Sequence, residues 1–144
     1  MQFGLNFFPC VDPKDRSAEQ YFRESLHLIG LSDELGYTHI RQVEHYFKPY
    51  GGYSPNPLLF LTAASQHTKK ARMITGAVLP AFNNPLKLAG EIGMLDGISG
   101  GRLEVGFARA FLLGHGVPCL QSQRAILRDK PAASAHGRGR VIRP

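Results

Sequence analysis

Residues 72–109 read RMITGAVLPAFNNPLKLAGEIGMLDGISGGRLEVGFAR, and this stretch decides the fold. It begins with a largely apolar strand candidate, 72–80, and ends with a second one, 102–109. Between them, Asn84 suits the N-cap of a helix and Pro85 suits its first turn. The stretch therefore predicts one strand–helix–strand unit. The positions that its pattern places in the core are Met73, Leu88, Ile92, Met94 and Leu95.

The same unit recurs towards the N-terminus. Two further strand candidates, 2–9 and 37–44, precede the first, and the starts of the four strands are 35, 35 and 30 residues apart. Each gap holds a helix candidate. The first helix candidate follows Ser17, which begins a capping-box pattern, and this helix should run until Gly36. The second begins near Pro57.

Strands and helices that alternate at about 30 residues per unit are typical of parallel βαβ architecture. A doubly wound sheet and part of a (β/α)8 TIM barrel both fit this order. A dinucleotide-binding sheet should carry GxGxxG after its first strand, and a phosphate loop should end in Gly-Lys-Ser/Thr. Neither motif occurs in the sequence, so the α/β barrel is favoured.

Composition excludes several other classes of protein. The chain has 144 residues, about the size of one domain, and no apolar run reaches the roughly 18–20 residues that a membrane span needs. Its start lacks the basic residues of a secretory signal. Two cysteines, Cys10 and Cys119, are too few for a disulfide framework. These features predict a cytoplasmic protein with free thiols that does not enter the membrane.

The net charge of +6 is concentrated at one end of the chain. Residues 112–144 hold six of the 17 basic residues and one of the 11 acidic residues. Residues 1–111 therefore have a net charge of only +1. A basic tail can contact phosphates weakly and without sequence preference, so no specific nucleic-acid partner is expected.

Polar and aromatic side chains gather where the predicted strands end. Glu44 and His45 lie at the end of the second strand, 79–83 at the end of the third, and Arg109 at the end of the fourth. In a barrel, the carboxyl ends of the strands carry the chemistry. A carboxylate, an imidazole, amides and a guanidinium there suit a flat aromatic ligand with a phosphate, and a flavin nucleotide is such a ligand.

Three segments carry a family resemblance: QFGLNFF at 2–8, VEHYF at 43–47, and TGAVLPAFNNPLKLAGEIGMLDGISGGRLEVGFARAF at 75–111. Together they resemble the bacterial luciferase-like flavin monooxygenases. The resemblance implies a (β/α)8 barrel that uses reduced FMN, or the deazaflavin F420 in a related branch. It covers residues 1 to about 111.

The resemblance also implies roles for individual residues. His45 matches a catalytic histidine near the reactive edge of the flavin ring, where an imidazole can exchange a proton near neutral pH. Glu44 matches an acid at the cofactor rim. Thr75–Gly76 matches a pair with a non-proline cis peptide against the ring, and Arg109 matches the arginine that grips the FMN phosphate. No metal site is expected.

The residues alone leave structural alternatives open. His45 also fits a polar residue that merely ends a strand, and Glu44 also fits a cap for the loop behind it. Gly76 also fits a packing glycine. Arg109 also fits a surface ion pair.

The resemblance ends after Phe111, although members of the family run to more than twice this length. The expected organisation is the N-terminal half of a luciferase-like barrel over 1–111, with its first four βα units. An atypical basic tail over 112–144 is expected to be largely disordered. Four units alone would leave two exposed edge strands and an open apolar interior.

The function that follows is a flavin-dependent monooxygenase, truncated here, that oxidises a small organic substrate with reduced flavin and O2. A flavin reductase partner and a homodimer are implied. Two alternatives stay open. One is an F420-dependent oxidoreductase of the same superfamily, and the other is a non-catalytic dimerising half-barrel or the remnant of a disrupted gene.

Overall fold

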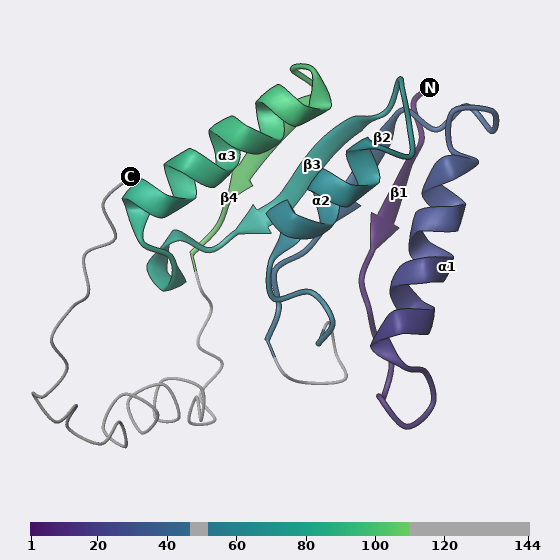
Figure 1. Cartoon of the computed structure of the whole chain (residues 1–144), viewed down its shortest axis with the longest axis horizontal. Coiled ribbons are helices and arrows are strands. Elements are labelled where there is room, and N and C mark those ends of the chain that lie inside the picture. Colours follow the sequence, from purple (N-terminus) through teal and green to yellow (C-terminus); the bar gives the residue numbers. More distant parts are fainter. Residues whose placement is uncertain (47–51, 110–144) are drawn as a thin grey trace, which may run out of the picture. The chain divides into compact units, whose positions relative to one another are not determined.

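The computed structural model describes residues 1–46 and 52–109, so the tail predicted for 112–144 lies outside the described residues. Strands and helices alternate along the chain (Figure 1). The elements are β1 (Gly4–Phe7), α1 (Ala18–Gly30), β2 (His39–Gln42), α2 (Pro57–Ser65), β3 (Arg72–Val78), the 3-10 turn η1 (Pro80–Phe82), α3 (Pro85–Ser99) and β4 (Leu103–Phe107). No helix in this part of the chain is long and apolar enough to cross a membrane.

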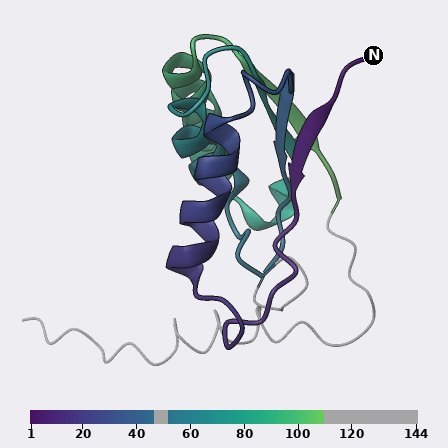
Figure 2. The same cartoon turned by 90° about the vertical axis from the view of Figure 1, so that its right-hand side faces the viewer.

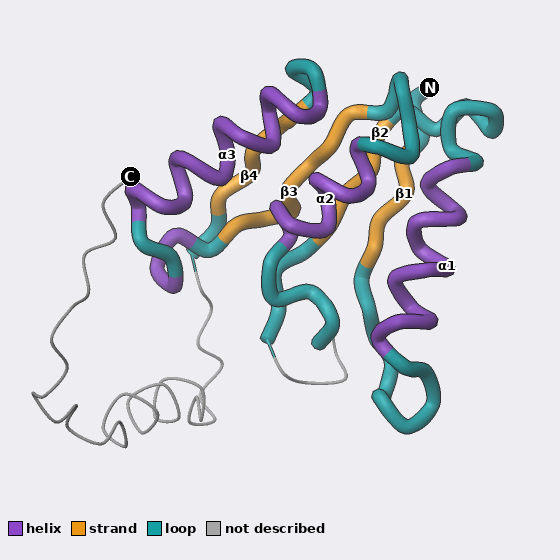
Figure 3. Tube along the Cα trace, in the orientation of Figure 1, coloured by secondary structure: helices purple, strands orange, loops and turns teal. Residues whose placement is uncertain are grey.

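The four strands form one parallel sheet in the order β1-β2-β3-β4, which leaves β1 and β4 as its edges (Figure 3). All three α-helices cover the same face of this sheet (Figure 2). This arrangement confirms the predicted parallel α/β fold. It is also the layout of successive βα units in a barrel, where helices lie on the outside of the strands.

Local sequence signals determine where the helices begin. The Ser17 side chain accepts a hydrogen bond from Gln20 N at 3.2 Å, which confirms the predicted cap of α1. Asn84 caps α3 in the same way, with Leu86 N at 3.0 Å and Lys87 N at 3.1 Å. These side-chain oxygens satisfy backbone donors that have no partner within the helix.

The predicted end of α1 at Gly36 is wrong, because the helix ends at Gly30 and Gly36 lies in the following turn with a φ of 76°. The cause is a tertiary contact. The Asp33 carboxylate accepts hydrogen bonds from Lys69 N at 2.6 Å and Lys70 N at 3.3 Å, at the start of the segment that leads into β3. This contact holds the chain away from a continued helix.

The hydrophobic core lies between the sheet and the helices. Met73 is fully buried there, as expected, but Met94 is 66% exposed and the prediction for it was wrong. Met94 precedes the buried Leu95, and consecutive residues of a helix point about 100° apart. The buried core residues are Phe7, Ile29, Ile40, Leu58, Phe60, Leu61, Ala64, Ala71, Met73, Val78, Leu88 and Leu95.

The other face of the sheet is polar. In β2, Ile40 and Gln42 are buried under the helices and Arg41 between them is exposed, as the alternation of side chains in a strand requires. The polar residues at the alternate positions are Asn6, His39, Arg41, Arg72 and Glu104. The face that the described helices leave open therefore differs from the expected apolar interior, because polar residues predominate at these positions and Ile74 lies among them.

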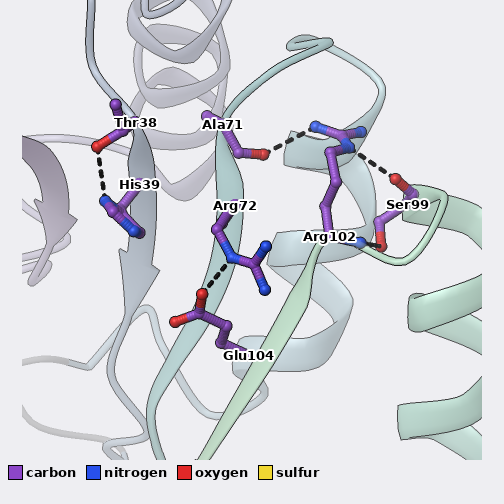
Figure 4. Close-up of polar contacts among 7 residues, drawn as sticks. All are labelled: Thr38, His39, Ala71, Arg72, Ser99, Arg102 and Glu104. Carbon is purple, nitrogen blue, oxygen red and sulfur yellow. Dashed lines mark hydrogen bonds and ion pairs between the residues drawn. The ribbon is translucent and has the colours of Figure 1, made fainter.

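Charged side chains tie the strands to each other and to the helices (Figure 4). Arg72 on β3 forms an ion pair with Glu104 on β4 across the uncovered face. The guanidinium of Arg102 donates to Ala71 O at 2.9 Å, Ser65 O at 2.8 Å and Ser99 O at 2.6 Å. One cation thus joins the carboxyl ends of α2 and α3, where helix carbonyls lack partners, to the start of β3.

A side chain joins β3 to β4 next to a shift in their register. The Thr75 hydroxyl donates to Gly106 O at 3.0 Å and accepts from Gly106 N at 2.8 Å. The register shifts between Thr75 and Val78. Gly106 has no room for a side chain, since a Cβ there would lie 2.6 Å from Thr75 O.

We expect Gly106→Ala to lower the free energy of unfolding by about 1–3 kcal/mol, because the new methyl would overlap a backbone oxygen that cannot move freely. Gly97→Ala is the matched control. A Cβ at Gly97 meets nothing within 4 Å, so alanine inside α3 should stabilise by about 0.5–1 kcal/mol. Urea denaturation of both variants measures the difference, and equal effects would contradict the packing of β3 on β4.

Candidate active site

Four of the five predicted site residues lie on or just after β2 and β3, and the fifth follows β4. Because the strands are parallel, their carboxyl ends meet at one edge of the sheet. Ala108 N donates to Val78 O at 3.0 Å, which places the backbone before Arg109 beside the end of β3. The sheet thus brings the strand-end positions together as the sequence predicted.

Glu44 lies at the centre of this edge and is only 6% exposed. Its carboxylate accepts hydrogen bonds from Leu79 N at 2.8 Å, from Asn83 Nδ2 at 3.5 Å and from the Tyr46 hydroxyl. Three donors from two segments therefore converge on one buried charge. The geometry fits the structural alternative, in which Glu44 braces the loop after β3 against the end of β2.

His45 follows directly and is half-buried. Its backbone N donates to Ser54 O at 2.9 Å, and its ring lies edge-on to Phe8 with the ring centroids 5.0 Å apart. Burial lowers the pKa of the His45 imidazole below its ordinary value of 6.5. At neutral pH the ring is therefore uncharged and has a nitrogen that can accept a proton.

Thr75 is 1% exposed, and its hydroxyl is engaged by Gly106 on both sides. The Thr75 side chain is therefore engaged within the sheet and joins β3 to β4. The non-proline cis bond lies one residue later than expected, between Gly76 and Ala77 rather than between Thr75 and Gly76. Thr75 is held in regular pairing with Val105, and the irregular segment of β3 begins only after it.

Gly76 is crowded by Arg41, a residue that the sequence reasoning did not select. A Cβ at Gly76 would lie 2.0 Å from Arg41 Nε and 2.6 Å from Arg41 Cζ. Arg41 Nη2 donates to Gly76 O at 2.9 Å, and Nη1 donates to Asn6 Oδ1 at 3.4 Å. The available signal was a long cation between two buried residues of a strand, Ile40 and Gln42.

Arg109 is exposed and has no ion-pair partner within residues 1–46 and 52–109. The same part of the chain holds no group of three His, Cys, Asp or Glu side chains that could bind a metal ion. Two guanidinium groups, Arg41 and Arg109, thus lie near the strand ends without a carboxylate partner in the described part. Together with a neutral imidazole, they fit an anionic, flat ligand such as FMN better than a metal.

Comparison with curated proteins gives a family. Residues 1–112 match the family model described as luciferase-like monooxygenase. The chain is 37% identical over 109 residues to the oxygenase component of the flavin-dependent trigonelline monooxygenase from Acinetobacter baylyi, a match that covers 76% of this chain and 30% of that protein. The chain spans about a third of the length of the curated relatives that it matches.

Solved structures agree on the fold. The monooxygenase RslO1 from Streptomyces bottropensis is 60% identical with a TM-score of 0.76, over 78% of this chain and 34% of that one. The FMN complex of the oxygenating constituent of 3,6-diketocamphane monooxygenase from Pseudomonas putida is 30% identical with a TM-score of 0.71, over 85% and 32%.

A more distant structural neighbour is the coenzyme F420-dependent tetrahydromethanopterin reductase from Methanopyrus kandleri. It is 27% identical with a TM-score of 0.55, over 86% of this chain and 30% of that one. The neighbours confirm an α/β fold of the luciferase-like TIM-barrel type for the described part of the chain.

We expect Glu44→Ala to lower the free energy of unfolding by about 2–3 kcal/mol, because three donors lose a buried acceptor. The control is Glu24→Ala, which removes a half-exposed ion pair with Arg16 and should cost less than about 1 kcal/mol. Urea denaturation measures both. If Glu44→Ala lowers the free energy of unfolding by no more than the control does, Glu44 does not brace the loop after β3.

The pH dependence of stability tests the environment of His45. Its pKa is lower in the folded state, so the unfolded chain binds the proton more readily. The stability that neutral His45 contributes is complete above pH 6.5 and is lost as the pH falls through its lower folded-state pKa. His45→Gln should flatten the loss of stability between about pH 7.5 and 5, whereas replacement of the exposed His67 should leave it unchanged.

Proposed function

The chain belongs to the luciferase-like monooxygenase family, and on that premise we propose that it forms the first four βα units of a flavin-dependent monooxygenase barrel. In our proposal, residues 1–111 supply these units and 112–144 lie outside them. The complete barrel oxidises a small organic substrate with reduced FMN and O2.

One observation carries this proposal: an imidazole that burial keeps neutral shares the carboxyl end of the sheet with two arginines, Arg41 and Arg109, that have no carboxylate partner in the described part of the chain. This combination suits a ligand that joins a flat ring to a phosphate. It also suits chemistry in which a proton moves near the ring at neutral pH. A 30%-identical neighbour with bound FMN supports the choice of cofactor.

Each residue has a defined task in this proposal. His45, kept neutral by burial, accepts a proton at a ring nitrogen and returns it. Arg109 binds the phosphate of the cofactor with its guanidinium fork. Glu44 contributes indirectly, since its bonds to Leu79 and Asn83 hold the loop that borders the site. FMN, when bound, supplies the redox chemistry with O2.

Gly76 and Thr75 contribute backbone rather than side chains. The buried Thr75 hydroxyl is bound to Gly106, so Thr75 contributes by fixing the backbone of β3 and β4 beneath the cofactor. The lack of a side chain at Gly76 leaves room for the planar Arg41 guanidinium over β3, so a cofactor ring at this point would meet that guanidinium.

Partners follow from the same family. The trigonelline relative is an oxygenase component, which supports a separate flavin reductase that delivers reduced flavin. A homodimer is supported by large apolar side chains exposed on α2 and α3, namely Leu59, Leu86 and Met94. Size-exclusion chromatography of the purified chain checks the dimer.

An F420-dependent oxidoreductase is the second candidate, supported by the F420-dependent structural neighbour. In that case the chain would take part in hydride transfer without O2. A third reading, a non-catalytic half-barrel or gene remnant, predicts no saturable binding of either cofactor.

The test is an anaerobic titration of the purified chain with reduced FMN, oxidised FMN and F420, followed by fluorescence or calorimetry. We expect saturable FMN binding that Arg109→Gln weakens about tenfold or more, since a charge-assisted contact to phosphate is lost. Arg23→Gln, which removes only an exposed pair with Glu19 on α1, should bind FMN like the unchanged chain.

Two outcomes would overturn the proposal. Saturable binding of F420 with none of FMN would favour the second candidate. No binding of either cofactor by a protein that circular dichroism shows to be folded would favour the non-catalytic reading.

A further inference from the structure

Arg41 occupies a position that only glycine at residue 76 permits. Its side chain leaves β2 on the face that the helices do not cover and lies over the neighbouring strand. There its guanidinium is bonded to Gly76 O at 2.9 Å, and any Cβ at residue 76 would overlap it. The group that packs on Gly76 is therefore a planar cation.

The charge of Arg41 is not neutralised within the described part of the chain. Arg72 on the same face is paired with Glu104, whereas the two partners of Arg41 are neutral oxygens, Gly76 O and Asn6 Oδ1. A guanidinium has five N–H donors, and Arg41 uses two of them here. The remaining donors and the whole positive charge are available to a ligand.

The location of this charge relates it to the proposed cofactor site. Gly76 lies two residues before the end of β3, and the neighbouring β2 continues directly into Glu44 and His45. The guanidinium covers Gly76 on the uncovered face, so a ring that binds against β3 there would meet the guanidinium. Asn6 on β1 holds that guanidinium from the other side.

We propose that Arg41 contacts the ring of the bound cofactor and favours its reduced, anionic form over its oxidised, neutral form. This inference rests on the proposed function, because it takes the ring to bind on the uncovered face against the guanidinium that covers Gly76. Reduced FMN loses a ring proton near neutral pH and then carries a negative charge on the ring as well as on the phosphate. A fixed guanidinium beside the ring stabilises that added charge, and the effect is large where water is excluded.

Arg41 and Arg109 should therefore differ in a measurable way. Arg109 is expected at the phosphate, which is present in both redox forms, so its loss should weaken both forms equally. Loss of Arg41 should weaken the reduced form more. By linkage, each tenfold change in the ratio of the two dissociation constants shifts the two-electron midpoint potential of bound FMN by about 30 mV.

The experiment measures the dissociation constants of oxidised and reduced FMN under anaerobic conditions for the unchanged chain and for Arg41→Gln, Arg41→Lys and Arg109→Gln. The ratio of the two constants should change about tenfold or more against reduced FMN in Arg41→Gln. It should stay within about threefold in Arg41→Lys, which keeps the charge. It should also be unchanged in Arg109→Gln.

The outcomes separate this inference from the function on which it rests. An unchanged ratio in Arg41→Gln, or equal weakening of both forms, would overturn the role of Arg41 and leave the flavin proposal intact. If the unchanged chain binds neither form, both proposals fall. If circular dichroism shows that Arg41→Gln does not fold, Arg41→Lys and Arg41→Met replace it. The midpoint potential of the bound FMN in these two variants then decides the same question.

Discussion

The described helices all cover one face of the four-stranded sheet, and the rest of the described structure depends on this constraint. Side chains that alternate along each strand must then be apolar on one side and tolerate a polar setting on the other. Ile40 and Met73 accordingly enter the core, while Arg41 and Glu104 do not. Because the strands are also parallel, their carboxyl ends all lie at the same end of the sheet. The residues of the candidate site are therefore close together even though they are far apart in the sequence.

Local chemistry made much of the fold predictable. A hydroxyl or amide oxygen one residue before a helix interacts only with the next few backbone donors, so Ser17 and Asn84 could be assigned as caps without tertiary information. The end of α1 could not, because the Asp33 carboxylate that redirects the chain is bonded to residues in another unit. Met94 was misplaced for a related reason: α3 is apolar on most of its surface, so periodicity did not distinguish its inner from its outer side.

The site was predictable in position more than in detail. The ends of parallel strands identified Glu44 and His45, yet only the folded chain revealed that the carboxylate of Glu44 is engaged by Leu79, Asn83 and Tyr46. Arg41 was overlooked because an arginine inside a strand resembles any solvent-facing charge until the neighbouring backbone is placed. Arg41 matters because of the neighbouring strand β3, where Gly76 has no side chain and so leaves space for the guanidinium.

Regular spacing along the sheet also governs how the chain can fold. Neighbouring strands pair residues that are about the same distance apart in sequence: Gly4 with His39, His39 with Arg72, and Met73 with Leu103. Loop-closure entropy rises only with the logarithm of loop length, so each pairing carries a similar entropic cost of ordering. Each described strand after β1 pairs with the strand that precedes it in the sequence, so each βα unit can add to the unit formed before it. Assembly of the described units can therefore proceed in the direction of synthesis, one βα unit at a time.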